Sequence, residues 1–115
     1  SGGMRQRVAL ARALTLDSEI LLMDEPFSAL DKQTANRLRS ELQDIWIKMK
    51  RTILFITHSV EEAVYLGDRV VVMSEKKQSI KDIITIGLPR PRHVYDDAFV
   101  QYRHQILEEV QNGEE

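Results

Sequence analysis

The sequence predicts an α/β fold in which a helix crosses between two parallel strands, and three observations support this. Residues 20–23 form an apolar run that ends in Asp24, Glu25 and Pro26. Such a run is typical of a strand buried on both faces of a parallel sheet, and a proline ends it because it cannot donate to the ladder. Residues 52–57 (TILFIT) form a second, β-branched run. The residues between carry a helical apolar stripe, so we predict a right-handed βαβ unit.

The first predicted element is a helix that follows two glycines and extends to about residue 16. Apolar residues share one side of this helix: Met4, Val8, Ala11, Leu10 and Leu14. Three arginines lie elsewhere on it: Arg5, Arg7 and Arg12. We interpret the arginines as surface or packing charges. The free N–H groups and the dipole at the start of such a helix favour an anion.

The long helix after the first strand is predicted to run from residue 32 to about residue 50. Asp31 is a suitable N-cap. The stripe that should face the core has helical spacing: Leu38, Leu42, Ile45, Trp46 and Met49. We expect its polar face to be solvated.

The remaining elements are predicted to be short. We expect a helix over residues 60–66 ended by Gly67, a strand over 69–74, and a polar turn leading to an antiparallel partner over 79–86. The stiff, basic segment 88–92 (LPRPR) connects the hairpin to an amphipathic helix over 96–110. Its role stays open at this stage. Tyr95 is interpreted as a packing residue, and residues 111–115 are expected to be disordered.

Composition narrows the class of protein. The chain has 115 residues, close to one small domain, and a net charge of -2, so nothing points to nucleic acid. It has no cysteine, which fits a reducing compartment. No apolar run approaches the roughly 18 residues that span a bilayer, and no signal peptide is visible.

Four motifs, in order and at matching spacing, resemble those of ATP-binding-cassette (ABC) ATPases. They are Ser1-Gly2-Gly3-Met4 with the helix that follows (the signature), ILLMDEP at residues 20–26 (Walker B), Ser28-Ala29-Leu30-Asp31 (the D-loop), and Thr57-His58-Ser59 (the switch histidine). The resemblance implies the C-terminal part of a P-loop NTPase domain, with parallel strands, crossover helices, a C-terminal antiparallel hairpin and a helix. Its regions would be residues 1–16, 17–74 and 75–115.

His58 follows the second strand, so it should lie beside Asp24 and Glu25 if the two strands are neighbours. The resemblance also implies roles for these residues. Asp24 would hold Mg²⁺, Glu25 would act on the attacking water as general base, and His58 would contact the γ-phosphate. Ser28 and Asp31 would lie at the interface of a dimer and couple its two ATP sites.

At the start of the first helix, Ser1, Gly2 and Gly3 would close on ATP held by the partner subunit. Gln6, one turn further on, is grouped with these nucleotide-binding residues. A phosphate-cradling GxxxxGK[ST] segment is absent from the 115 residues. We therefore expect the chain alone to be inactive and to represent part of a longer subunit.

The segment from His58 to Ser74, GLPRPR and the last helix resemble importer ATPases for nitrate, sulfonate and taurine. The resemblance implies a second ATPase subunit, a transmembrane permease and, through it, a solute-binding protein, at the cytoplasmic face of the plasma (inner) membrane. The alternatives are a non-transport ABC ATPase of the DNA-repair or chromosome type, or a truncated, non-catalytic interaction piece. The transported solute stays open.

Overall fold

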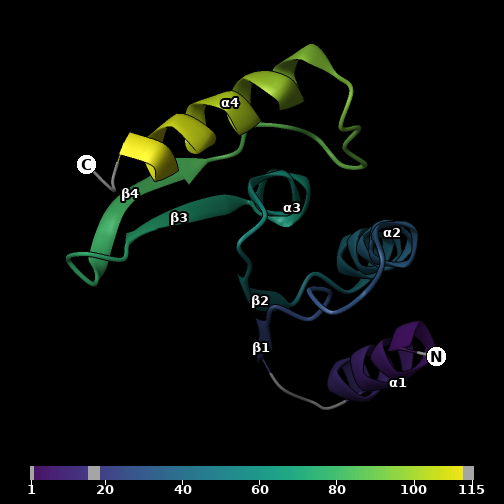
Figure 1. Cartoon of the computed structure of the whole chain (residues 1–115). Helices are drawn as coiled ribbons and strands as arrows, with labels where there is room; N and C mark the ends of the chain where they lie inside the picture. Colours follow the sequence, from purple (N-terminus) through teal and green to yellow (C-terminus); the bar gives the residue numbers. More distant parts are fainter. Residues whose placement is uncertain (1, 16–18, 113–115) are drawn as a thin grey trace. The chain divides into compact units, whose positions relative to one another are not determined.

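The computed structural model of the chain describes residues 2–15 and 19–112, with backbone only at residues 2, 10 and 13–15. Its elements follow in the order α1 (Gly2–Thr15), β1 (Ile20–Asp24), α2 (Lys32–Met49), β2 (Thr52–Ile56), α3 (Val60–Leu66), β3 (Arg69–Ser74), β4 (Ser79–Thr85) and α4 (Asp97–Asn112) (Figure 1). The chain forms two compact units, Ser1–His58 and Ser59–Glu115. No helix in the described part of the chain is long and apolar enough to cross a membrane.

The first unit contains the predicted pair of parallel strands. β1 and β2 pair in register, with Leu22 opposite Leu54 and Asp24 opposite Ile56. α2 connects the two strands. The predicted strand–helix–strand order and the parallel pairing are therefore confirmed.

Helix α2 begins and ends at residues with clear capping geometry. The Asp31 carboxylate accepts hydrogen bonds from the backbone N–H of Thr34 (3.1 Å) and from its hydroxyl (2.7 Å), as an N-cap should. At the other end Lys50 adopts a left-handed conformation, with φ of 48°, and its N–H donates to the Trp46 carbonyl. Leu38 and Leu42 of the predicted stripe are buried, whereas Met49 at its end is 46% exposed.

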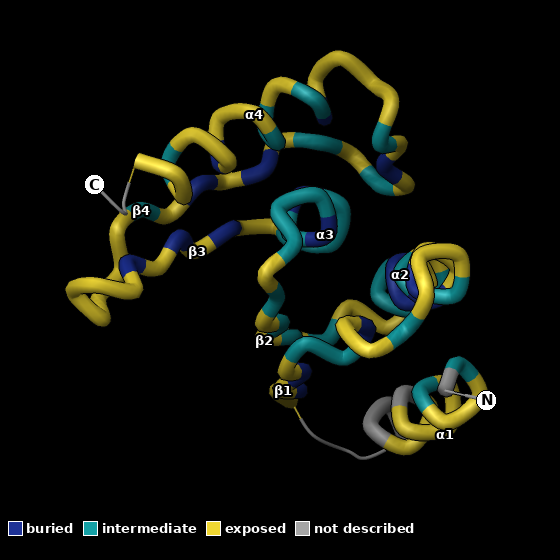
Figure 2. The backbone as a smooth tube through the Cα atoms, viewed as in Figure 1, coloured by how far each residue is buried: buried dark blue, intermediate teal, exposed yellow. Residues whose placement is uncertain are grey.

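The prediction that β1 is buried on both faces is wrong. Burial alternates along the strand: Leu21 and Met23 are buried, whereas Ile20 and Leu22 are 65% and 66% exposed. In β2, exposed residues alternate with half-buried ones. Figure 2 colours each described residue by how far it is buried. A two-stranded sheet has two faces, and the described residues cover only one of them.

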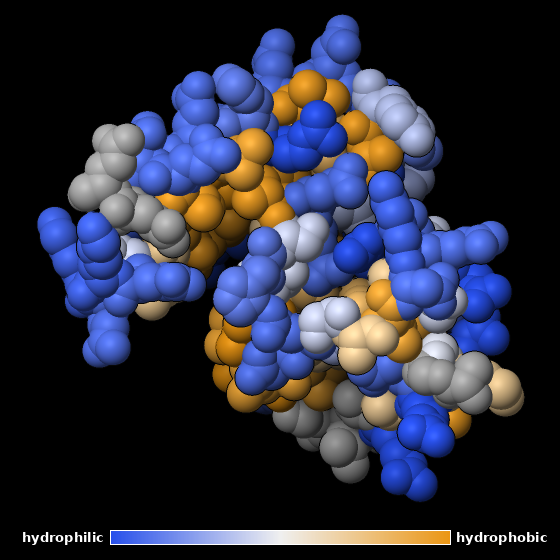
Figure 3. Space-filling view, viewed as in Figure 1, coloured by the Kyte–Doolittle hydropathy of each residue, from blue (hydrophilic) through white to orange (hydrophobic). Residues whose placement is uncertain are grey.

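The open face of this sheet carries large apolar side chains. Ile20, Leu22, Leu54 and Ile56 are exposed, and the strand register places them on one side. Orange apolar atoms reach the surface around β1 and β2 in Figure 3. Exposed apolar faces of this kind mark interaction surfaces or favour association.

The second unit is built on the predicted antiparallel hairpin. β3 and β4 pair antiparallel, with an irregularity between Val72 and Met73. One face of the hairpin packs with α3 and α4 around a single apolar cluster. Its buried members are Val64, Val70, Val72, Ile84, Ile86, Phe99 and Ile106.

Two features of the second unit differ from the prediction. Helix α4 continues through Gln111 to Asn112, so the expected disorder from residue 111 is wrong at these two positions, and residues 113–115 lie outside the described part. Tyr95, interpreted from the sequence as a packing residue, is 91% exposed. It lies in the connection before α4 and is not among the residues packed on the apolar cluster of the second unit.

Candidate functional site

The candidate site lies where β1 and β2 end. Asp24 is the last residue of β1 and pairs with Ile56, the last residue of β2. The backbone N–H of Glu25 donates to the Ile56 carbonyl at 2.8 Å, which extends the pairing by one step. Because parallel strands end at the same edge of a sheet, the residues that follow them meet there.

His58 and Glu25 meet at this edge. His58 Nδ1 contacts Glu25 Oε1, although 33 residues separate them in the sequence. The His58 side chain is 78% exposed and that of Glu25 is 33% exposed, so both reach solvent. The expectation that His58 lies beside the acidic pair is thus confirmed.

The backbone of the loop after β1 aims the Glu25 side chain. Glu25 has φ of 45°, a left-handed conformation that is uncommon for residues other than glycine. Its carbonyl accepts hydrogen bonds from the N–H (3.3 Å) and hydroxyl (3.1 Å) of Ser28. Phe27 is buried and its ring lies against Phe55 of β2, which fixes the loop to the sheet.

Asp24 is the metal ligand predicted from the sequence, and its carboxylate is a group that Mg²⁺ could bind. Its side chain is exposed at the end of β1. Among residues 2–15 and 19–112, no group of three or more His, Cys, Asp or Glu side chains could hold a metal ion. Mg²⁺ commonly keeps several waters and uses one or two carboxylates plus substrate phosphates. A single exposed carboxylate fits that pattern.

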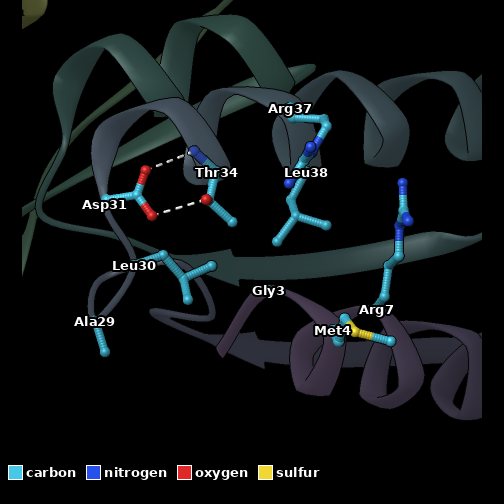
Figure 4. Close-up of a pocket in the computed structure, with 9 residues that line it drawn as sticks. All are labelled: Gly3, Met4, Arg7, Ala29, Leu30, Asp31, Thr34, Arg37 and Leu38. Carbon is cyan, nitrogen blue, oxygen red and sulfur yellow. Dashed lines mark hydrogen bonds between the residues drawn. The ribbon is translucent and has the colours of Figure 1, made fainter. Parts of the chain in front are cut away.

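The start of α1 borders a cavity of about 230 Å³ (Figure 4). A Cβ placed on Gly3 would come within 2.7 Å of the Thr34 side chain, so the approach of α1 to α2 requires glycine there. Gly2 is the first residue of α1, and Ser1 lies outside the described residues. The cavity is lined by α1, the loop before α2, and α2: Gly3, Met4, Arg7, Ala29, Leu30, Asp31, Thr34, Arg37 and Leu38.

Gln6, predicted to bind nucleotide, and Asp31, predicted to lie at a dimer interface, both make hydrogen bonds within the first unit. Gln6 Nε2 donates to the carbonyl of Pro26, which ties α1 to the loop after β1. Hydrogen bonds from Thr34 lower the pKa of the Asp31 carboxyl and engage both of its oxygens. Arg7, interpreted as a surface or packing charge, pairs with Glu41 of α2. The sequence carries no local signal for the Gln6 contact, because its partner lies 20 residues away.

The chain is similar in sequence to known ABC transporter proteins. A family model described as ABC transporter matches residues 1–28. The chain is 58% identical over 107 residues to an uncharacterized ABC transporter ATP-binding protein of Methanocaldococcus jannaschii, covering 93% of the chain and 40% of that protein. It is 45% identical over 113 residues to an aliphatic sulfonates import ATP-binding protein of Bacillus cereus, covering 98% of the chain and 45% of that protein.

A solved structure agrees with these matches. It is the dimeric structure of a post-hydrolysis state of an ATP-binding cassette bound to ADP and Pi. It is 30% identical, with a TM-score of 0.62, covering 77% of this chain and 37% of that one.

The fold and the site therefore define an α/β protein of the P-loop NTPase class. Within that class, the chain is similar to ABC transporter ATP-binding proteins and corresponds to the C-terminal part of their ATP-binding domain. It spans less than half the length of the curated relatives described above.

Proposed function

We propose that this chain contributes the water-activating half of the ATP site in the nucleotide-binding subunit of an ABC importer. The observation that carries the proposal is the contact between Glu25 and His58 at the shared end of two parallel strands. Phosphoryl transfer requires positioning, charge neutralisation and an oriented water, and this pair supplies the last of these.

The two side chains have different tasks in this proposal. The Glu25 carboxylate accepts the proton of the attacking water as general base, and its loop geometry holds it at the edge of the sheet. The His58 ring, held by Glu25 and largely exposed, contacts the γ-phosphate and keeps the water in line. Asp24 would hold Mg²⁺, partly through water; the ion, when bound, neutralises charge on the phosphate oxygens.

The partners follow from the same proposal. Gly2 and Gly3 at the start of α1, together with Ser1 before them in the sequence, close on ATP held by a second subunit, with Ser28 and Asp31 near the interface. The dimeric state of the similar cassette supports this. The relative that imports aliphatic sulfonates supports a small anionic or organic solute, a permease and, through it, a solute-binding protein. The subunit would lie on the cytoplasmic face of the membrane.

A chimeric subunit tests the proposal. The matching 113-residue segment of the Bacillus cereus sulfonate import protein is replaced by the corresponding part of this chain, and ATP hydrolysis is measured. We expect activity, and we expect Glu25→Gln and His58→Ala each to lower it by about 10² to 10⁴-fold. Glu19→Gln, at an exposed glutamate just before β1, is the matched control. If Glu25→Gln hydrolyses ATP as fast as Glu19→Gln, the proposed role is wrong.

A further inference from the structure

Two carboxyl side chains of the second unit occupy positions where the core pattern calls for apolar residues. On β4, Asp82 lies two residues before the buried Ile84, so both side chains point to the same face of the hairpin. On α4, Glu109 lies three residues after the buried Ile106, so both share the packed face of the helix. Ile84 and Ile106 belong to one buried cluster. The two acids are half-buried and therefore lie at the edge of that cluster.

An extra residue in β4 ends the inward-facing row of this strand at Asp82. Asp82 and Ile80 pair with successive residues of β3, so Lys81 is the extra residue between them. Because of this bulge, the Ile80 side chain, which strict alternation would place beside Asp82, is 58% exposed. The Nζ of Lys81 donates to the backbone carbonyl of Glu109. β4 and the end of α4 therefore meet at the bulge.

The Glu109 carboxyl lies beside another acceptor rather than beside a donor. Its Oε2 is buried, and no hydrogen-bond donor in the described part of the chain reaches it. The Asp82 carboxyl lies within hydrogen-bonding distance of Glu109, and its Oδ1 accepts from the N–H of Ile83 at 2.8 Å. Two ionised carboxylates are both acceptors, so a hydrogen bond between them requires one proton. That hydrogen bond, burial and the charge of Asp82 raise the pKa of Glu109, while the charge of Lys81 opposes the rise.

The other charged groups around α4 are engaged away from this carboxyl pair. Glu108 pairs with His104 of the same helix at 3.1 Å. Arg103 lies 3.6 Å from Glu61 of α3. Residues 70–73 of β3 carry no charged side chain. The lysine at the β4 bulge is therefore the main charge outside the pair that acts on it.

We propose that Asp82 and Glu109 form a pH-dependent latch, which holds the end of α4 on β4 when the two carboxyls share one proton. When both are ionised they repel each other, and the end of the helix loosens. The folded pKa of Glu109 lies above its ordinary value of 4.5, so the contribution of the latch to stability is complete below pH 4.5 and is lost as pH rises through the raised folded value. The latch lies within the second unit and does not depend on the proposed ATP site.

The test uses the full 115-residue chain without nucleotide, over about pH 3 to 8, which brackets the usual titration of carboxyl groups. By NMR, the carboxyl carbon of Glu109 gives its titration midpoint, and the Cα shifts of residues 109–112 report how fully the end of α4 is helical. Residues 100–103 of the same helix are the internal reference. Asp82→Asn and Glu109→Gln are isosteric, and each supplies an amide donor in place of the shared proton. Glu108→Gln, which removes the adjacent carboxylate of α4, is the matched control.

We expect the Glu109 midpoint of the parent chain to lie above 4.5 and to fall further in Asp82→Asn than in Glu108→Gln. We also expect the helical signals of residues 109–112 to weaken with rising pH in the parent and to stay constant in both isosteric variants, while those of residues 100–103 do not change.

A parent midpoint at or below 4.5, or equal shifts in Asp82→Asn and Glu108→Gln, would overturn the proposal. Helical signals at residues 109–112 that do not depend on pH, or that change together with those of residues 100–103, would also overturn it. If one isosteric variant does not fold, the other is judged by the helical signals.

Discussion

Phe27 anchors the loop that carries Glu25, and its replacement by alanine should strongly destabilise the first unit. The side chain is 3% exposed, and its ring centroid lies 5.9 Å from that of Phe55. Truncation of a buried phenylalanine to alanine costs about 3–5 kcal/mol of folding free energy. A unit of the size of Ser1–His58 has about 3–9 kcal/mol in total at typical values per residue. Phe27→Ala should therefore remove most of the stability of this unit.

The assay can follow this unit selectively. Trp46 is the one tryptophan in the sequence and lies in α2, so urea unfolding followed by its fluorescence reports on the first unit. Phe27→Leu keeps apolar volume but loses the ring pair, and should cost at least about 0.5–1.5 kcal/mol. Gln33→Ala, at an exposed position of α2, is the control. If Phe27→Ala and Gln33→Ala unfold at the same urea concentration, the loop is not anchored as described.

Three further predictions concern the chain alone. In a calorimetric titration, the chain alone should bind Mg-ATP at least about a thousandfold more weakly than the chimera does. The reason is that the sequence has no GxxxxGK[ST] segment to supply charge-assisted hydrogen bonds. Tight binding by the chain alone would contradict the assigned site. Leu22→Lys with Leu54→Lys should reduce self-association in light scattering, because both side chains lie on the open sheet face; a parent chain that stays monomeric at high concentration would refute this. The folded pKa of Asp31 lies below its ordinary value of 3.8, so its capping contribution is complete above that pH and is lost as pH falls through the lowered pKa. Circular dichroism should show loss of helix below about pH 3.8. This loss should be smaller in Asp31→Asn, because asparagine does not titrate.

The element boundaries could be predicted because their signals are local. Pro26 follows the end of β1, Asp31 caps α2, and Gly67 follows α3. Each acts within one helical turn or one strand end, so a single sequence is enough to place it. The meeting of Glu25 and His58 was also predictable, because parallel neighbouring strands bring their ends to one edge.

Burial and long-range contacts could not be predicted in the same way. An apolar run such as that of β1 shows that a strand can be buried, but not that residues cover its second face. The bond from Gln6 to the Pro26 carbonyl, and those from Arg90 and Arg92 to the end of α3, join residues 20 to 28 positions apart. Nothing in the local pattern around these side chains specifies which carbonyl they reach.

The proposed chemistry requires a glutamate at position 25, but the left-handed backbone conformation there favours glycine. Glutamate with φ of 45° carries a conformational cost of order 1 kcal/mol or more, which glycine would largely avoid. A selection for thermal tolerance alone would therefore accept Glu25→Gly and discard the carboxylate beside His58. Variants recovered from such a selection should be sequenced at the codon for residue 25 first. A substitution there that raises the melting temperature would also remove the carboxylate on which the proposed ATP hydrolysis depends.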